Sequence, residues 1–204
     1  MRLQFLGSGD AFGSGGRFNT CFHLTRTRHG NVLIDCGASS MVAIRKWGVD
    51  PNGISTVLVS HLHGDHFAGL PFLLLDAQLV SRRTAPLTLA GPPGFEARLM
   101  TVMEAMFAGS TSVERRFALT IRELALHERT AITGLHVTPY LMKHYSGAPS
   151  YALRIETDGK VISYSGDTEW VEELIPAGRD ADLFICEAYF FDKVTKYHLS
   201  LIHI

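Results

Sequence analysis

The chain has little cysteine, almost no net charge and no long apolar run, and each shortage excludes a class of protein. Its three cysteines, Cys21, Cys36 and Cys186, lie far apart and never form a C-x-x-C pair, so neither a disulfide scaffold nor a cysteine-only zinc knuckle is expected. Its 19 basic and 20 acidic side chains leave a formal net charge of −1, which provides no general attraction to nucleic acid or anionic membranes. No stretch approaches the roughly 18 apolar residues of a membrane span, and the N-terminus lacks a signal-peptide run. We therefore expect a cytoplasmic globular protein with no membrane partner.

Periodic apolar segments predict a single domain over residues 1–198 that mixes strands with helices. Short apolar runs bounded by turn residues predict strands, over residues 1–7, 21–26, 32–37, 54–60, 117–124, 135–144, 151–167 (a hairpin turning at Asp158–Gly159) and 182–191. Apolar residues at helical spacing predict helices over residues 41–48, 71–80, 94–109 and 169–175, with Ser39 or Ser40 as the N-cap of the first. The apolar runs within 54–60 and 182–191 predict buried strands. This order favours an α/β (α+β) fold with layers of helix, sheet, sheet and helix.

Histidine is the residue type in excess, with ten in the chain. The densest group lies in HLHGDH, directly after a predicted buried strand, and it offers four metal-capable side chains: His61, His63, Asp65 and His66. In an extended backbone His61 and His63 point to the same side, and a turn at Gly64 lets the next aspartate and histidine face the same point. Neutral imidazoles and a carboxylate suit zinc, and less specifically manganese or iron. The stretch therefore predicts half of a two-metal site.

The sequence SHLHGDHFAGLP resembles the H-x-H-x-D-H motif of the metallo-β-lactamase superfamily, and most of all its ribonuclease Z-like branch. Other segments follow in the order of that family: a glycine-rich loop after the first strand, LIDCG with Asp35, His144 at a strand end, and YSGDT with Asp167. The resemblance covers nearly the whole chain and implies a four-layer αββα sandwich.

The resemblance also implies two metal ions, expected to be Zn²⁺, with Mn²⁺ or iron as alternatives. The implied ligands are His61, His63 and His144 for the first ion, Asp65 and His66 for the second, and Asp167 between them. Asp35 would support the ligand loops through hydrogen bonds, although capping the next helix is an alternative. The remaining histidines of the domain match no family motif and are expected to be structural or solvent-facing: His23, His29, His127 and His136.

The same resemblance implies the chemistry. Two ions would activate a bridging water as a hydroxide nucleophile and polarise a phosphoryl or carbonyl oxygen. Asp65 would orient or deprotonate that water besides binding metal. The family's general acid is a histidine that follows a strand carrying Glu-Ala, and the matching residues here are Glu187 in CEAYFF and His198 in HLS. The expected activity is that of a dinuclear-zinc phosphodiesterase.

The substrate expectation rests on two departures from ribonuclease Z. That family reads EGTQ after DCG, whereas this chain reads ASSM. Only 23 positions (167 − 144) separate His144 from Asp167, which leaves no room for the long arm that grips transfer RNA. A small phosphodiester, such as a cyclic nucleotide, is therefore favoured over an RNA 3′ end, and a homodimer is compatible with the resemblance. The alternatives are a lactone, thioester or β-lactam hydrolase, an iron-dependent oxidoreductase, and a non-catalytic binding protein.

The last residues differ from the family in another way. The family's domain continues past the general acid with a helix and a strand whose Thr-His end completes the second metal site, whereas this chain reads LSLIHI. That peptide is a translation of CTGTCTCTTATACACATC, a transposon end used in preparing sequencing libraries. We therefore expect residues 199–204 to be a non-native tail, the domain to lack its last helix and strand, and His203 not to bind metal.

Overall fold

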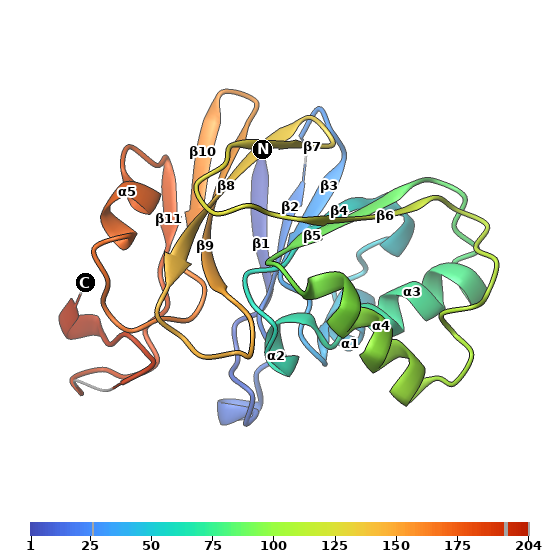
Figure 1. Cartoon of the computed structure of the whole chain (residues 1–204), viewed down its shortest axis with the longest axis horizontal. Helices are drawn as coiled ribbons and strands as arrows, with labels where there is room; N and C mark the ends of the chain where they lie inside the picture. The colour runs from blue at the N-terminus through green and yellow to red at the C-terminus, as the bar shows by residue number, and fades with distance from the viewer. Residues whose placement is uncertain (26, 194–195, 204) are drawn as a thin grey trace.

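The computed structural model describes residues 1–25, 27–193 and 196–203, and its strands form two sheets (Figure 1). The first sheet has the order β1-β2-β3-β4-β5-β6, formed by β1 (Arg2–Gly7), β2 (Cys21–Thr25), β3 (Asn31–Ile34), β4 (Ile54–Leu58), β5 (Leu87–Gly91) and β6 (Leu119–Glu123). The second has the order β11-β10-β9-β8-β7, formed by β7 (Thr130–Ile132), β8 (Leu135–Met142), β9 (Ser150–Thr157), β10 (Lys160–Tyr164) and β11 (Leu183–Ile185). Strands β3 to β6 run parallel, as expected for strands that are joined by helical crossovers.

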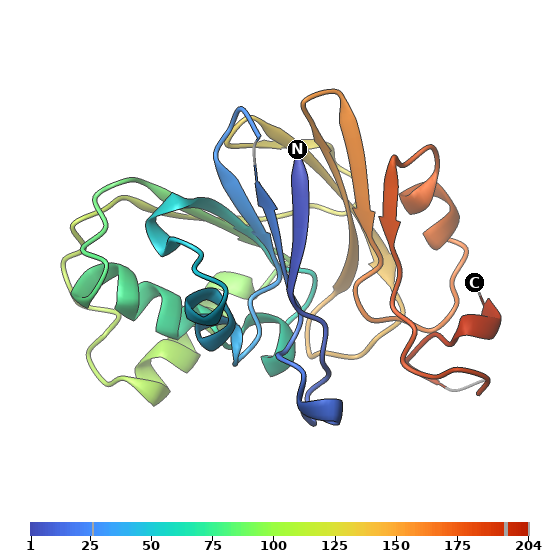
Figure 2. The same cartoon turned by 180° about the vertical axis from the view of Figure 1, so that it is seen from behind.

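Helices cover the outer face of each sheet. Figures 1 and 2 show α1 (Ser40–Lys46), α3 (Leu70–Leu79) and α4 (Phe95–Met106) beside the first sheet, and α5 (Leu174–Gly178) beside the second. A short helix, α2 (Gly64–Phe67), and three 3-10 turns, η1 (Ser14–Gly16), η2 (Pro51–Gly53) and η3 (Leu201–His203), complete the described elements. None of the described helices is long and apolar enough to cross a bilayer. The layers confirm the predicted four-layer αββα sandwich.

Three apolar clusters hold these layers together. The first joins the helices α1, α3 and α4 to the first sheet and includes Val57. The second fills the space between the two sheets and includes Leu58. The third lies under α5 and includes Leu174. Val57 and Leu58 are both fully buried on opposite faces of β4, because successive side chains of a strand point to opposite faces. The predicted burial of this strand on both faces is confirmed, and it holds the following histidine motif in place.

Two predicted elements on the C-terminal side are wrong in extent. The predicted buried strand 182–191 is reduced to β11, where Leu183 is 41 % and Phe184 39 % exposed. The reason is that β11 pairs only with β10 and lies at a sheet edge, where one side of the strand faces solvent. The predicted helix 169–175 begins only at Leu174, because Glu169 N–H donates to the carbonyl of Lys143 at 3.3 Å and so joins the end of β8.

Several smaller features also differ from the expectation. The strands β5 and β7 are not predicted from the sequence, because both are short and β5 is flanked by prolines. Ser39 precedes α1 as predicted, but its side chain makes no capping bond, and its hydroxyl instead donates to Asn19 Oδ1 at 3.0 Å. The predicted strand 21–26 ends at Thr25, and residue 26 lies outside the described residues. Residue 204 of the predicted tail also lies outside the described residues. That the domain lacks its last helix and strand stays a prediction.

The loop after β3 packs directly against the segment that carries the histidine motif. Cys36 N–H donates to the His66 carbonyl at 2.7 Å, and Ala38 N–H donates to the Gly64 carbonyl at 3.1 Å. Gly37 lies between these two bonds, and a β-carbon there would come within 2.0 Å of the Asp65 carbonyl oxygen. Only a glycine therefore allows the two loops to approach this closely.

We expect Gly37→Ala to destabilise the fold by about 1–3 kcal/mol or more, because the clash is with backbone that cannot move aside cheaply. Denaturant unfolding measures this loss, and metal content measures the displacement of Asp65. The matched control is Gly53→Ala, where the nearest atom is the side-chain Nδ2 of Asn31 at 3.2 Å. Equal stability of the two variants would contradict the packing argument.

Candidate metal centre

The predicted ligands come from both sheets and meet at one edge of the sandwich. His61 and His63 follow β4, while Asp65 and His66 lie in the first turn of α2. Two further ligands come from the second sheet, His144 just after β8 and Asp167 just after β10. The face-to-face packing of the sheets therefore brings together residues that are about a hundred positions apart in the sequence.

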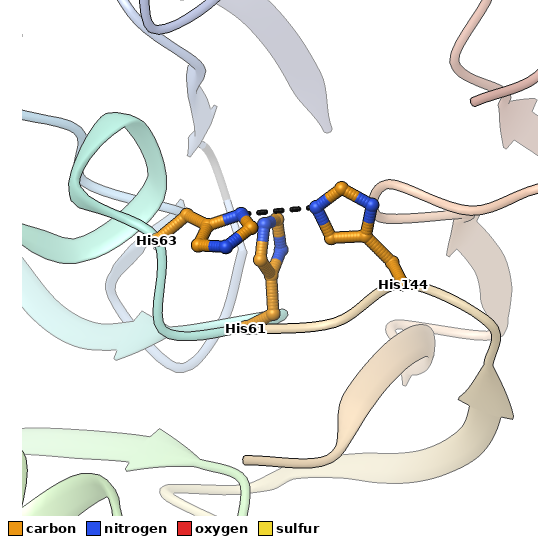
Figure 3. Close-up of side chains that lie close together, drawn as sticks. All are labelled: His61, His63 and His144. Atoms are coloured by element: carbon orange, nitrogen blue, oxygen red, sulfur yellow. Dashed lines mark hydrogen bonds between the residues drawn. The ribbon is translucent and has the colours of Figure 1, made fainter. Parts of the chain in front are cut away.

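The first group consists of His61, His63 and His144, whose ligand nitrogens lie within 4.8 Å of one another (Figure 3). His144 Nε2 lies 2.9 Å from His63 Nδ1, the contact marked by the dashed line in Figure 3. The other nitrogen of His144, Nδ1, donates to the backbone carbonyl of Tyr197 at 3.0 Å. This bond directs the lone pair of His144 Nε2 toward the cluster.

The second group consists of His61, His66 and Asp167. The Asp167 Oδ2 atom lies 3.4 Å from His66 Nε2, 4.0 Å from His61 Nε2 and 3.9 Å from His144 Nε2. Asp65 Oδ2 lies 3.4 Å from His66 Nε2 on the other side. The Asp167 carboxylate of the second group thus also lies within 4.0 Å of two histidines of the first, His61 and His144, where the resemblance places a bridging ligand.

Asp35 supports this arrangement through buried hydrogen bonds. Its side chain is fully buried and accepts three hydrogen bonds: from Ser60 N–H at 2.7 Å, from Ser60 Oγ at 2.8 Å and from His66 Nδ1–H at 2.7 Å. The described hydrogen bonds of the Asp35 carboxylate go to these two residues and none goes to α1. The geometry therefore favours the supporting role over the helix cap, which was the alternative.

The same network sets the proton positions on His61. Because Ser60 Oγ donates its proton to Asp35, it accepts at its other contact, from His61 Nδ1–H at 3.0 Å. His61 Nε2 is then unprotonated, and this buried atom has no hydrogen-bond partner among the described residues. Three imidazoles therefore present Nε2 lone pairs to the Asp167 carboxylate, an electron-rich centre that requires a cation. The donor set fits divalent metal ions of the zinc type.

The electrostatics agree with that fit. Burial lowers the pKa of His61 well below its usual range, so this imidazole is neutral as a ligand must be. Burial also acts to lower the pKa of His66, but the charges of Asp167 and Asp35 outweigh it and raise that pKa well above the usual range. Burial raises the pKa of Asp167, yet His66 and the other imidazoles lower it overall. The centre therefore attracts positive charge, either a proton or a metal ion.

The predicted acid, His198, lies beside this centre. Its Nδ1 is 3.1 Å from Glu187 Oε2 and 3.9 Å from Asp167 Oδ2. Glu187 Oε1 also accepts the backbone N–H of Thr168 at 2.5 Å, which anchors the carboxylate. Burial lowers the pKa of His198, but the hydrogen bond and charge of Glu187 raise it overall. The structure thus brings the predicted Glu–His pair to the predicted metal site.

The other histidines stay outside the centre. His23 is buried in β2, His127 pairs with Glu173 on the surface at 2.9 Å, and neither His29 nor His136 belongs to a described metal-capable group. The Nδ1 atom of His203 accepts the backbone N–H of Ser200 at 3.1 Å, and that His203 does not bind metal stays a prediction.

Sequence reasoning missed the residues that form the wall of the site. A cleft of about 990 Å³ opens over the centre, and its lining includes Asp10, Arg17 and Phe12 of the glycine-rich loop together with Tyr189. The Asp10 carboxylate accepts hydrogen bonds from Ser14 and from the Phe12 backbone, which lower its pKa to about 2. Polar and aromatic residues inside a glycine-rich loop were the available signal, because surface loops placed by a rigid scaffold often carry binding residues.

The four-layer sandwich with imidazoles and carboxylates at the joint edge of its sheets defines a metallo-hydrolase of the metallo-β-lactamase superfamily, of the ribonuclease Z-like kind. Within that class, the chain belongs to the family described as Anti-Pycsar protein Apyc1, which matches residues 1–203.

Individual relatives agree with this assignment. Ribonuclease Z of Agathobacter rectalis is 25 % identical over 211 residues, which cover 80 % of this chain and 67 % of that protein. The crystal structure of the short form of human tRNase Z superposes with a TM-score of 0.79 at 26 % identity, covering 99 % of this chain and 85 % of that one. A diphosphatase of the PhnP family superposes with a TM-score of 0.71 at 18 % identity, over 98 % of this chain and 78 % of that one, and shares the fold.

Proposed function

We propose that this protein is a dinuclear-zinc phosphodiesterase that hydrolyses a small phosphodiester such as a cyclic nucleotide. The observation that carries the proposal is the convergence of three Nε2 atoms, from His61, His66 and His144, on one oxygen of Asp167 at 3.4–4.0 Å. A carboxylate shared by two groups of ligands is the arrangement that two cations require.

Each side chain of the centre has a task in this proposal. Zn²⁺ ions held there would supply Lewis acidity, which lowers the pKa of water and stabilises charge on phosphoryl oxygens. His61, His63 and His144 would hold one ion, Asp65 and His66 the other, and Asp167 both. Mn²⁺ or iron would fit the same oxygen and nitrogen donors less specifically.

The proton transfers fall to two residues. Asp65 has a carboxylate oxygen directed at the centre, and it would orient the attacking water by accepting its proton. His198 would donate a proton to the leaving oxygen, since Glu187 stabilises its protonated form. Glu187 itself is half-buried beside His198 and would hold the imidazole in the donating orientation.

The cleft supports a small substrate over a long RNA. Its volume of about 990 Å³ is in the range of sites for small organic ligands. Arg17 is the one lysine or arginine side chain among the described residues that line it, so the cleft offers little attraction to a polyanion. The segment between His144 and Asp167 is the hairpin β9–β10, which turns at Asp158–Gly159. An RNA 3′ end remains the second substrate class, supported by the names of the ribonuclease Z relatives.

A substrate panel tests this proposal. Protein stripped with chelator and reloaded with Zn²⁺ or Mn²⁺ should hydrolyse bis-p-nitrophenyl phosphate and cyclic nucleotides, and it should cleave precursor transfer RNA weakly or not at all. Lactone and thioester substrates serve as the comparison, because the same metal chemistry could act on a carbonyl group. Faster turnover of those esters, or stoichiometric iron with no phosphodiester turnover, would overturn the proposal.

A further inference from the structure

The segment that carries His198 has little regular structure among its described residues. It follows β11 and is joined to its own neighbours by an isolated bridge between Phe190 and Ser200 and by a bond from Tyr189 N–H to the Leu199 carbonyl at 3.0 Å. A backbone of this kind does not by itself fix the rotation of an imidazole ring. The side chains around His198 must therefore do so.

Tyr189 is placed to hold that ring by its face. The Tyr189 and His198 rings are stacked, with centroids 4.8 Å apart and planes inclined by 27°. The edge of the imidazole is held by Glu187, 3.1 Å from Nδ1, and the ring of His144 lies at 5.0 Å in an edge-on arrangement. A stacked aromatic ring restricts the tilt of its partner, which an edge contact alone does not.

The other end of Tyr189 faces the glycine-rich loop. Its hydroxyl lies near the Asp10 carboxylate, whose charge adds to the effect of burial in raising the pKa of the Tyr189 phenol. That carboxylate is itself fixed, because it accepts Phe12 N–H at 3.0 Å, Ser14 N–H at 3.0 Å and Ser14 Oγ at 2.6 Å. Tyr189, Asp10 and His198 all line the cleft, so the stacked ring lies between the His198 segment and this loop.

We propose that Tyr189 is a positioning residue for proton donation by His198: its stacked ring sets the plane of the imidazole. This inference rests on the proposed function, in which His198 protonates the leaving oxygen. A loss of the stack should then slow the reactions that need the proton and affect other reactions less.

Two substrates with the same nucleoside and different leaving groups separate a positioning role of Tyr189 from a merely structural one. One is thymidine phosphate esterified to p-nitrophenol, whose anion leaves without a proton, and the other is thymidine phosphate esterified to methanol, which needs one. The readout is the ratio of kcat for the nitrophenyl ester to kcat for the methyl ester, measured on the full chain loaded with Zn²⁺. A merely structural defect lowers both rates together and leaves this ratio unchanged.

Relative to the native chain, the ratio should rise about 100-fold in His198→Asn, the usual size of a lost general acid. In Tyr189→Leu, which removes the stacked ring, it should rise about 10-fold through misorientation of the donor. In Tyr189→Phe, which keeps the stacked ring, it should stay near the native value, because the ring and not the hydroxyl sets the imidazole plane. Tyr189→Phe preserves the shape of the side chain and so guards against misfolding of the leucine variant.

The matched control is Tyr140→Leu. The ring of Tyr140 also lies against a histidine, His127, with centroids 5.6 Å apart, but this pair is outside the cleft. The ratio of the two kcat values should therefore stay unchanged in Tyr140→Leu. An unchanged ratio in Tyr189→Leu, with the expected rise in His198→Asn, would overturn the positioning role and leave the proposed function standing. An unchanged ratio in His198→Asn would show that the proposed proton donor is wrong, and the role of Tyr189 would fail with it.

Discussion

Replacing Asp167 with asparagine should lower phosphodiesterase activity by at least about 1,000-fold, because the metal ions supply several kcal/mol of transition-state stabilisation and each 1.36 kcal/mol is tenfold in rate. The reason lies in the convergence of the His61, His66 and His144 nitrogens on one oxygen of this carboxylate. An amide keeps an oxygen but not the negative charge that balances the cations. Bound zinc should fall along with activity.

The experiment pairs metal analysis with turnover of bis-p-nitrophenyl phosphate. Asp182→Asn is the control, because the Asp182 carboxylate also holds a cation, Lys160, but does so on the surface away from the centre. It should keep full zinc content and full activity. Native zinc content in Asp167→Asn together with lost activity would show that Asp167 acts in the chemistry alone, against the bridging position assigned to it.

Replacing Asp35 with alanine should have the second-largest effect, on stability and on metal affinity together. The carboxylate is fully buried and accepts three hydrogen bonds, and its removal leaves the Ser60 N–H and the His66 imidazole unpaired in the interior. Breaking such a buried pair costs about 3–5 kcal/mol. Loss of the partner that orients a ligating histidine lowers metal affinity by about 10- to 100-fold.

Urea unfolding and zinc titration measure the two effects separately. Asp35→Asn is the informative companion, since the amide can accept only part of the three bonds and should lie between the native chain and the alanine variant. Asp50→Ala is the matched control, because Asp50 accepts a single backbone N–H, from Asn52 at 2.9 Å, at the start of η2. The free energy of unfolding of Asp50→Ala should fall by about 1 kcal/mol, as for other helix N-caps. A zinc affinity unchanged in Asp35→Ala would contradict the supporting role.

The strands and helices that the sequence predicts well are those whose burial is set by near neighbours. The apolar run of β4 is buried on both faces as predicted, because a segment rich in β-branched and apolar residues suits a strand covered by layers on either side. The histidine motif directly after it is equally local. His61, His63, Asp65 and His66 span one turn of chain between a strand and a helix, so their proximity follows from backbone geometry.

Predictions fail where the outcome depends on which element lies alongside. The run 182–191 is as apolar as β4, yet only Leu183–Ile185 forms a strand, because this segment has one neighbour in the sheet where β4 has two. The start of α5 is displaced for a related reason, since Glu169 bonds to the end of β8 before the helix can begin. No pattern within either segment reports these contacts.

The order of strands and helices and the HLHGDH motif follow from the sequence, because both depend on spacing along a few turns of chain. The αββα class and the other ligands of the centre were expected from the resemblance to the metallo-β-lactamase superfamily. Only the packed structure brings Asp167 among three imidazoles, Asp35 against Ser60 and His66, and the ring of Tyr189 onto that of His198. Each of these contacts joins segments far apart in the chain. Their distances are set by the packing of two sheets across a shared core, which no local pattern records.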